Sequence, residues 1–274
     1  MPHAAINGAK LHYTDTGAGA ETIFFVHGLA FDGRMFDAQI DHLKSRYRCI
    51  SMDLRGHGQS ELSEGGYEMD SLAADAVGLI EHLGCGPCHF VGWSIGGFMG
   101  LRIAIKQPTL LRSLVLIGAG SMAGSEADFG FKMVPHLTRF FGMGPVVGAL
   151  MSSMFAPTFL KDPARAQQKE MWRTRFRANQ AMGVSRAARG VIAQSSVDEG
   201  LGSIVTPTLM LQGEFDNVLP MATARKTSEK IRGAKLVVIE RAGHAVTMEE
   251  PAQVERALDT FLAGLPNVAQ AASA

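Results

Sequence analysis

The chain has 274 residues, 46% apolar and 19% charged, and its 26 basic and 26 acidic residues give a formal net charge of +0. This composition is typical of a globular protein, and without a basic excess we expect neither nucleic acid nor a membrane surface as a partner. No signal peptide is expected at the start, and no apolar run approaches the roughly 18 residues that span a bilayer. Only three cysteines are present, which argues against a disulfide framework and for a cytoplasmic location.

Strand and helix patterns alternate along most of the chain. The first residues alternate in polarity around Asn7-Gly8, which predicts a β-hairpin. Continuous apolar runs typical of strands buried on both faces follow at residues 22–26, 49–52, 89–92, 113–118, 208–212 and 236–240. Helical patterns lie between or after them at residues 35–44, 70–83, 96–106, 222–231 and 252–262. This order predicts a doubly wound, mostly parallel α/β sheet.

Residues 121–200 interrupt the alternation, because they contain helical stretches separated by Gly and Pro and no convincing strand. We predict a helical insertion between two parts of one core, residues 1–120 and 201–265. The insertion holds seven of the 15 Met and seven of the 15 Phe, which suits either ordinary core packing or a pocket for apolar ligands. Its ten basic residues against six acidic ones would attract an acidic substrate or simply form a solvated face. Residues 266–274 lack periodicity and are expected to be disordered.

The segment Gly92-Trp-Ser94-Ile-Gly96 follows a predicted strand and opens a predicted helix. In a sharp strand-turn-helix, small residues are needed two positions before and after the serine, and the hydroxyl is exposed at the carboxyl edge of the sheet. This context makes Ser94 a candidate nucleophile. The alternative is a serine that caps the helix N-terminus in a Gly-rich turn.

A nucleophilic serine needs a base and an acid that orients the base. Asp216 and His244 each follow a later predicted strand, so their loops share the sheet edge with Ser94. Glu214 is a rival for the acid because it lies closer to the strand end. For the oxyanion we expect the backbone amides of Ile95 and Leu29, which follows His27-Gly28 directly after the first long strand. His27 itself is expected to hold that turn.

Five segments carry a family resemblance: HGLA (27–30), SMDLRGHGQS (51–60), GWSIGG (92–97), PTLMLQGEFDNVLP (207–220) and AGHAVTMEEP (242–251). With them the chain resembles the α/β-hydrolase fold superfamily of esterases, lactonases and carbon–carbon hydrolases. The resemblance implies an eight-stranded, mostly parallel sheet with helices on both faces, and a helical cap formed by residues 121–200. It also supports Ser94 as nucleophile, Asp216 as acid and His244 as base. Asp53, Arg55 and His57 match a loop beside the site and are expected to be structural.

We therefore expect a serine hydrolase that cleaves a carboxylic ester or a lactone through an acyl-enzyme, with no metal or organic cofactor. Its substrate should be a small molecule with an apolar part. One alternative is cleavage of a carbon–carbon bond or an enol-lactone in aromatic catabolism; the carbon–carbon reaction is disfavoured by Trp93 and by Ala245-Val246, where such enzymes carry Asn and an aromatic residue. Another alternative is a ligand sensor with slow turnover. Five side chains are expected to line the substrate pocket: Trp93, Phe141, Met154, Trp172 and Val218.

Cys85-Gly-Pro-Cys88 has the spacing of a redox dithiol. Such a centre usually places its first cysteine at a helix N-terminus, where the helix dipole stabilises the thiolate. Here the motif lies after a predicted helix and before a strand, so Cys85 is at a helix C-terminus, where the dipole disfavours a thiolate. We expect a tight loop at the amino edge of the sheet rather than a redox site.

Overall fold

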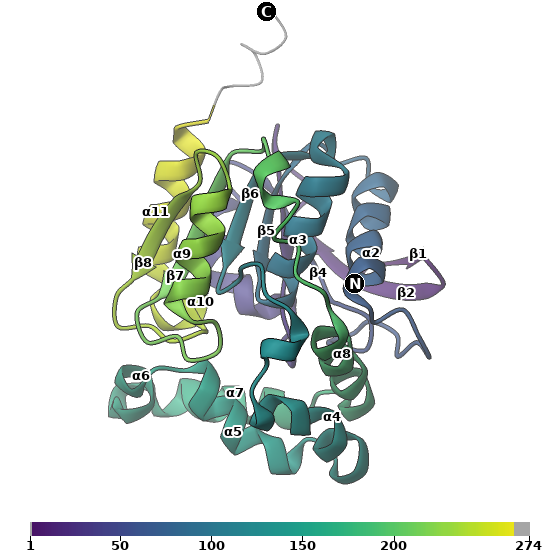
Figure 1. Ribbon diagram of the computed structural model, residues 1–274, viewed down its shortest axis with the longest axis vertical. Coiled ribbons are helices and arrows are strands. Elements are labelled where there is room, and N and C mark those ends of the chain that lie inside the picture. The colour runs from purple at the N-terminus through teal and green to yellow at the C-terminus, as the bar shows by residue number, and fades with distance from the viewer. Residues whose placement is uncertain (1, 266–274) are drawn as a thin grey trace, which may run out of the picture.

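The computed structural model describes residues 2–265, and the tail predicted to be disordered, 266–274, lies outside the described residues (Figure 1). One sheet runs in the order β1-β2-β4-β3-β5-β6-β7-β8. Its strands are β1 (His3–Ile6), β2 (Ala9–Asp15), β3 (Thr22–Val26), β4 (Arg48–Met52), β5 (Cys88–Trp93), β6 (Leu111–Ile117), β7 (Thr208–Gly213) and β8 (Lys235–Ile239). The helices of the core are α1 (Asp37–Leu43), α2 (Met69–His82), α3 (Ile95–Lys106), α9 (Met221–Lys230), α10 (Val246–Glu249) and α11 (Pro251–Ala263). This architecture confirms the predicted fold class.

The N-terminal hairpin forms as predicted. Asn7 and Gly8 both have positive φ, 47° and 75°, which a two-residue turn of type I′ requires at its two central positions. The hairpin joins the sheet through β2, which pairs antiparallel with β4. All later neighbouring strands pair in parallel, as their helical crossovers demand.

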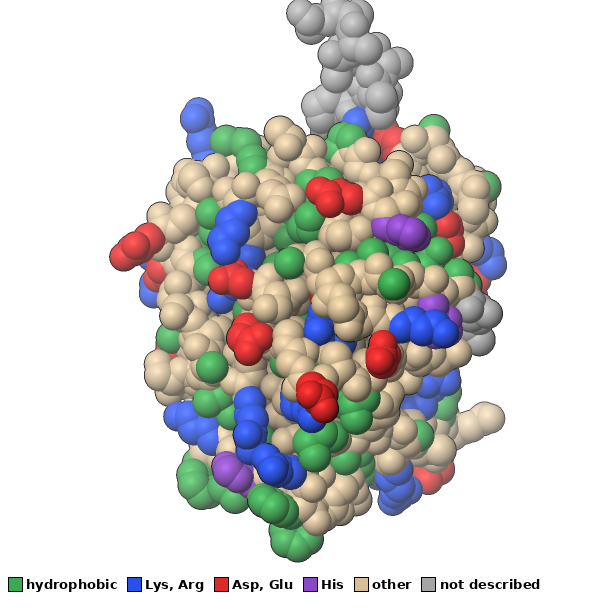
Figure 2. Space-filling model, turned by 90° about the vertical axis from the view of Figure 1, so that its right-hand side faces the viewer, with side chains coloured by type: hydrophobic (Ala, Val, Ile, Leu, Met, Phe, Trp, Pro, Cys, Tyr) green, Lys and Arg blue, Asp and Glu red, His purple; other side chains and the backbone are tan. Residues whose placement is uncertain are grey.

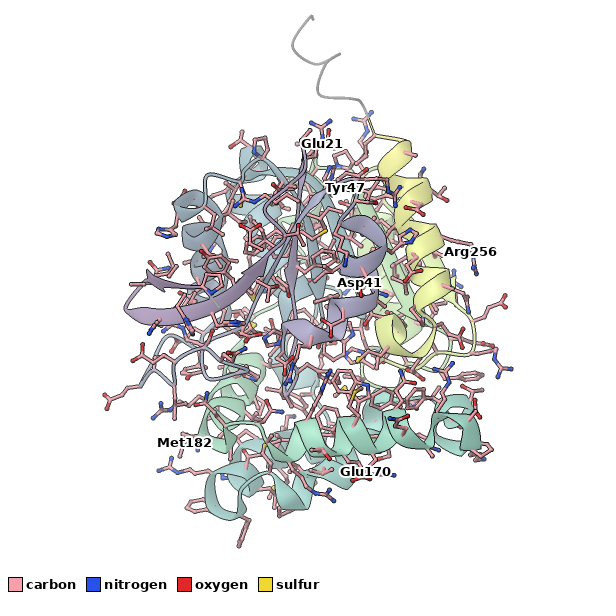
Figure 3. All side chains as sticks on the ribbon, turned by 180° about the vertical axis from the view of Figure 1, so that it is seen from behind. Glu21, Asp41, Tyr47, Glu170, Met182 and Arg256 are labelled. Carbon is pink, nitrogen blue, oxygen red and sulfur yellow. The ribbon has the colours of Figure 1, made fainter. Side chains whose placement is uncertain are left out.

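Helices cover both faces of the parallel part of the sheet. Helices α2, α3 and α9 lie on the face turned to the viewer in Figure 1, and α1 and α11 cover the opposite face in Figure 3. Strands β3, β5 and β7 are buried along their whole length, which explains their uninterrupted apolar sequences. Strand β8 differs from the expectation: Val237 and Val238 are 37% and 38% exposed, because β8 is the edge of the sheet.

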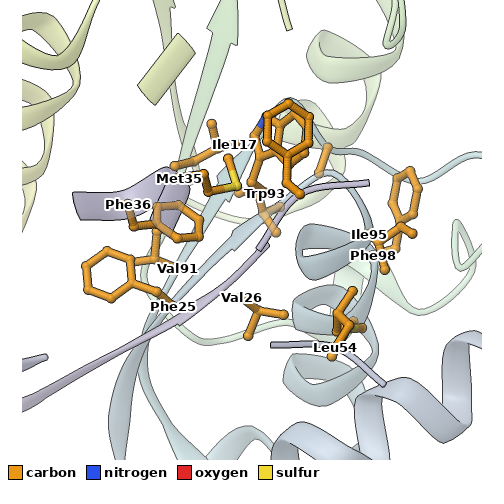
Figure 4. Close-up of a cluster of buried hydrophobic side chains, with 14 of the residues drawn as sticks. Phe25, Val26, Met35, Phe36, Leu54, Val91, Trp93, Ile95, Phe98 and Ile117 are labelled. Carbon is orange, nitrogen blue, oxygen red and sulfur yellow. The ribbon is translucent and has the colours of Figure 1, made fainter. Parts of the chain in front are cut away.

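The order of the strands determines where a ligand can bind. From β3 the chain continues to β4 on one side and then crosses to β5 on the other side of β3. In doubly wound sheets such a reversal opens a crevice at the carboxyl ends of the two diverging strands. Here those ends are followed by the His27-Gly28 turn and by Ser94. Beneath them lies a cluster of buried side chains that includes Phe25, Val91 and Trp93 (Figure 4).

The insertion lies between β6 and β7 and contains helices but no strand, and the structure describes all of its residues. It packs at the carboxyl end of the sheet (Figure 1). Its two ends meet at a neck, where Ser121 Oγ lies 2.9 Å from Ser196 Oγ and the Gly124 amide donates a 2.9 Å hydrogen bond to the Gln194 carbonyl. Its helices are α4 (Phe129–Phe141), α5 (Val147–Met154), α6 (Pro157–Lys161), α7 (Ala166–Arg177) and α8 (Ala181–Ala193).

Several short 3-10 helices join these elements, namely η1 (Gly33–Phe36), η2 (Pro108–Leu110), η3 (Gly124–Glu126), η4 (Gly144–Val146), η5 (Pro163–Arg165) and η6 (Leu201–Ser203). The helix predicted at residues 35–44 therefore begins as η1 and continues as α1. The face shown in Figure 2 carries charged side chains of both signs, with several Lys and Arg side chains gathered toward its lower left. In the part of the chain that the structure describes, no helix combines the length and apolarity needed to cross a membrane.

Candidate active site

Ser94 occupies a sharp turn between β5 and α3. Its backbone has φ 53° and ψ −111°, a conformation that residues other than glycine rarely adopt. The flanking glycines make the turn possible. A Cβ on Gly92 would lie 2.3 Å from the Gly96 carbonyl oxygen, and one on Gly96 would lie 2.1 Å from the Val26 carbonyl oxygen. Both positions therefore require glycine, for the steric reason that the sequence pattern suggests.

The Ser94 hydroxyl does not serve as a helix cap. Although Ser94 directly precedes α3, its side chain makes no capping hydrogen bond. The turn is held by its backbone instead: the Ser94 amide donates to the Ile117 carbonyl at 2.9 Å, and the Ser94 carbonyl accepts from the Phe98 amide at 3.0 Å. The side chain stays available for other contacts, which removes the helix-cap alternative.

Asp216 and His244 form a hydrogen-bonded pair. His244 Nδ1 lies 2.8 Å from Asp216 Oδ2, and both side chains are buried. The other carboxylate oxygen, Oδ1, accepts from the amides of Val218 and Leu219 at 2.8 and 3.0 Å. Burial alone would raise the pKa of the Asp216 carboxyl, but the contact with His244 and these amides hold it below its usual value. An ionised Asp216 fixes the proton of the neutral ring on Nδ1 and leaves Nε2 as the acceptor.

Loops from three strands bring His244 next to the serine turn. Trp93, the neighbour of Ser94, donates from Nε1 to the His244 carbonyl at 2.8 Å, and the two rings lie 4.7 Å apart. Gly118, after β6, has φ +52°, and a Cβ there would lie 2.9 Å from His244 Cε1 and Nδ1. His244 Nε2 is buried and has no hydrogen-bond partner within residues 2–265. In serine hydrolases without bound substrate, the hydrogen bond between the imidazole Nε2 and the nucleophilic serine is often long.

Glu214, the rival acid, does not contact His244. Its residue is exposed, and its carboxylate accepts a hydrogen bond from the Arg241 amide at 2.9 Å. The chain turns between Glu214 and Asp216, since the Asp216 amide donates to the Gly213 carbonyl at 3.3 Å. Only the later carboxylate is directed toward the imidazole.

The turn after β3 lies against the serine turn. A Cβ on Gly28 would lie 2.8 Å from Ser94 Cβ, so the two turns are in direct contact. His27 fixes this turn: Nδ1 lies 2.8 Å from the Gly28 carbonyl, and Nε2 accepts from the Leu54 amide at 2.9 Å. Burial lowers the pKa of His27, so the ring is neutral and structural. Within residues 2–265, the amides of Leu29 and Ile95 have no hydrogen-bond acceptor.

The segment from residue 51 to residue 60 is built into the core. Asp53 accepts from His12 Nδ1 and from the Gly33 amide, each at 2.8 Å. Arg55 forms a two-pronged ion pair with Asp75, with both hydrogen bonds at 2.7 Å. His57 is fully buried, and burial lowers its pKa to about 4. These contacts agree with the structural roles expected for Asp53, Arg55 and His57.

The five side chains predicted to line a pocket have different surroundings. Met154 and Trp172 are buried, and Trp93 is fully buried beneath the site. Val218 is half-buried beside Asp216. Phe141 requires a correction: it is 70% exposed at the end of α4, so it is not part of an enclosed lining. The buried residues of that helix are Pro135 and Thr138, whereas Phe141 is its last residue and lies where the helix ends at Gly142.

Several basic residues of the insertion have acidic partners. Arg173 and Arg177 lie 3.6 and 3.7 Å from Glu170, and Arg165 lies 3.7 Å from Glu250. These are partly exposed pairs of the kind found on solvated helix faces. Attraction of an acidic substrate by the insertion stays a prediction.

The CGPC segment forms the loop between α2 and β5, at the amino edge of the sheet, as predicted. Cys85 and Cys88 are buried free thiols. Burial raises the pKa of the Cys85 thiol to about 11 and that of Cys88 further. Thiolate chemistry needs the opposite shift, so the loop has the character of a structural element.

Sequence reasoning did not single out two residues that help to build the site. Gly118 limits the space beside the His244 ring, and its only signal was its position directly after a strand. Glu249, in α10, is 1% exposed and accepts hydrogen bonds from the amides of Gly243 and Ala156. Within the sequence TMEEP it resembles an ordinary surface glutamate, because its partner Ala156 is far away along the chain.

The family model described as alpha/beta hydrolase fold matches residues 21–251. The chain belongs to the α/β-hydrolase fold family. It is 28% identical over 236 residues to a putative carbamate hydrolase RutD of Pantoea ananatis, with 85% of each chain covered. It is 27% identical over 253 residues to 3-oxoadipate enol-lactonase 2 of Acinetobacter baylyi, with 92% of each covered.

Solved structures of the same fold superpose closely. An enol-lactonase from Burkholderia xenovorans LB400 gives a TM-score of 0.88 at 24% identity, covering 96% of this chain and 100% of that one. A thermophilic esterase from Thermogutta terrifontis, with malate bound, gives 0.87 at 27% identity, covering 95% and 97%. Together with the family match, these relatives identify the chain as a hydrolase of this family.

Proposed function

We propose that the chain is a serine hydrolase that cleaves a carboxylic ester or a lactone through an acyl-enzyme. The observation that carries the proposal is the buried hydrogen bond of 2.8 Å between Asp216 and His244, beside a serine held in a strained turn. A serine hydroxyl is a weak nucleophile, and an oriented imidazole is the group that activates it. The proposed mechanism depends on the Asp216–His244 pair.

In the proposed reaction, His244 Nε2 accepts the proton of Ser94 Oγ while the oxygen attacks the substrate carbonyl carbon. The ionised Asp216 stabilises the imidazolium that forms. The amides of Leu29 and Ile95 donate to the oxyanion of the tetrahedral intermediate, and losing one such donor typically lowers turnover by about 10²–10³. His244 then returns the proton to the leaving alkoxide, and water hydrolyses the acyl-enzyme with His244 again as base.

The insertion acts in this proposal as a cap that supplies apolar pocket walls. Met154 and Trp172 are its candidate lining residues, joined by Trp93 and Val218 from the core. The enol-lactonase and carbamate hydrolase names of the relatives favour substrates in which a heteroatom leaves from an acyl carbon. An enol-lactone is therefore the second candidate substrate. A cytoplasmic location and the absence of a cofactor stay predictions.

The test is a substrate panel run on the wild type and on Ser94→Ala. The panel contains p-nitrophenyl esters of increasing acyl length, γ-lactones, an enol-lactone and an aryl carbamate. We expect multiple turnovers on at least one acyl substrate, loss of that activity in Ser94→Ala, and labelling of Ser94 by a fluorophosphonate. Undiminished hydrolysis by Ser94→Ala would refute the proposal, and a single slow turnover on every substrate would favour the ligand-sensing alternative.

A further inference from the structure

Glu249 lies in α10, five residues after His244, and its side chain is buried. One carboxylate oxygen, Oε1, accepts from the Gly243 amide at 2.9 Å. The other, Oε2, accepts from the Ala156 amide at 2.8 Å. A single carboxylate thus bridges the loop that carries His244 and the part of the insertion that follows α5.

The two bridged segments also touch each other directly. The Ala245 amide donates to the Met154 carbonyl at 2.8 Å. A Cβ on Gly243 would lie 2.7 Å from the Ala156 nitrogen, so the backbones are too close for any side chain between them. The Thr158 hydroxyl donates to the Arg241 carbonyl. The loop is therefore attached to the insertion on both sides of His244.

We infer that Glu249 is a positioning residue. Because it bridges Gly243 and Ala156, the position of the His244 imidazole relative to Ser94 depends on how the insertion packs on the core. The inference rests on the proposed function, because it assigns Glu249 a role through His244. The geometry supports it: the Gly243 amide belongs to the residue directly before His244, and the Ala245 amide to the residue directly after it. Displacement of a reacting group by about 1 Å is enough to cost up to 100-fold in rate.

The charge state of the bridge matters, since only a carboxylate offers an acceptor to both amides. Burial raises the pKa of Glu249 to about 7, while the Ala156 and Gly243 amides and Arg165 lower it and Asp216 raises it. The charged groups that act on it are Arg165 on η5 and Asp216 in the loop after β7, and its neighbour Glu250 lies 3.7 Å from Arg165. The bridge therefore changes its protonation near neutral pH.

Glu249→Gln tests this inference, with Glu250→Gln as the matched control. Glutamine keeps the shape but presents an NH₂ group to one of the two amides, so one hydrogen bond is lost. The control makes the same change one residue later, where the carboxylate contacts Gln253 and Arg165 and not the His244 loop. The readout is kcat per active site, with sites counted by the burst of p-nitrophenol or by fluorophosphonate titration, so that misfolded protein does not contribute.

For Glu249→Gln we expect kcat per site to fall by about 10- to 100-fold, with KM little changed and the control near wild type. The ratio of wild-type to Glu249→Gln kcat should rise between about pH 6 and pH 8, because the wild-type carboxyl ionises in that range. A wild-type kcat per site in Glu249→Gln, or an equal loss in Glu250→Gln, would overturn the inference. If Ser94→Ala also kept full activity, the proposed function would fail instead, which separates the two outcomes.

Ala156→Pro provides a second variant, in which residue Glu249 itself is unchanged. Ala156 has φ −65° and Phe155 before it is extended, so the backbone angles suit proline. The ring Cδ takes the place of the amide hydrogen, so the variant removes the donor to Oε2 and pushes the carboxylate away from the insertion. We expect the same fall in kcat per site. If Ala156→Pro turns over at the wild-type rate, the insertion does not control His244 and the inference is wrong. This variant decides the question if Glu249→Gln fails to fold.

Discussion

The carboxylate of Asp216 divides its two oxygens between two tasks. Oδ2 receives the 2.8 Å hydrogen bond from His244 Nδ1 and one of 2.9 Å from Gln212 Nε2, while Oδ1 is held by the amides of Val218 and Leu219. Because the backbone fixes one oxygen, the other can face the imidazole in only one orientation. The carboxylate is thus already oriented toward the imidazole, and its charge keeps the proton of the neutral ring on Nδ1.

Asp216→Asn should therefore leave the fold intact and remove most of the activity. The amide can still bond the imidazole, but it favours the wrong tautomer and gives no charge to stabilise the imidazolium. We expect kcat for ester hydrolysis to fall on the order of 10³- to 10⁴-fold. Glu214→Gln is the control and should retain wild-type kcat, and a reversed order of effects would make Glu214 the acid.

Gly118→Ala should impair activity more than its effect on stability explains. An alanine there would have to adopt a left-handed φ of +52°, which lowers the free energy of unfolding, and its Cβ would lie 2.9 Å from the His244 ring. Gly233→Ala is the control, since Gly233 has φ +75° but nothing within 4 Å of the added Cβ. In both variants the free energy of unfolding, measured with urea, should fall by about 1 kcal/mol or more. Only Gly118→Ala should lose kcat, and equal activities would show that His244 tolerates the contact.

His57 should make the fold less stable as the pH falls below neutrality. Its pKa is lowered from 6.5 to about 4 by burial, so the unfolded chain takes up a proton that the folded chain does not. Its contribution is complete above pH 6.5 and is lost as the pH falls toward 4, by about 3 to 4 kcal/mol in all at about 1.4 kcal/mol per pKa unit. Urea midpoints measured from pH 7 to pH 5 should fall more steeply for the wild type than for His57→Gln. Parallel slopes would contradict this account.

The thiols of Cys49 in β4 and of Cys85 and Cys88 in the CGPC loop should be inert in the folded protein, because all three are buried. Burial raises the pKa of the Cys85 thiol to about 11 and that of the Cys49 thiol to about 12, so almost no thiolate is present at neutral pH. Reaction with Ellman's reagent should be slow in buffer and complete in guanidinium. Rapid labelling of the native protein at pH 7 would reopen the redox hypothesis for this loop.

Much of the fold and the core of the site follow from local patterns. Buried parallel strands need unbroken apolar runs, so β3, β5 and β7 are visible in the sequence, and Ser94, Asp216 and His244 each follow a strand that such runs identify. Exposure of β8 was not predictable, because its position at the edge depends on the order of all eight strands. Local sequence patterns also do not predict the burial of a side chain whose neighbours come from distant parts of the chain.

The burial of Phe141 and that of Glu249 are both the reverse of what their side-chain types suggest. Phe141 is exposed at the last position of α4, although it follows the buried Thr138 by three residues. Glu249 is buried because Ala156 and Gly243 supply donors for both of its carboxylate oxygens. Local hydrophobicity carries neither piece of information. Both require the packing of the insertion on the core.

The neck at Ser121 and Ser196 has a consequence for how new specificities arise. The chain leaves the core and returns to it at one point, because Ser121 Oγ and Ser196 Oγ lie 2.9 Å apart. The segment between them can therefore be replaced without changing the register between β6 and β7. Recombination at these two serines would exchange the insertion as a unit. A transplanted segment would need one local feature to work with the resident histidine: a free backbone amide at the position of Ala156 to meet the carboxylate of Glu249.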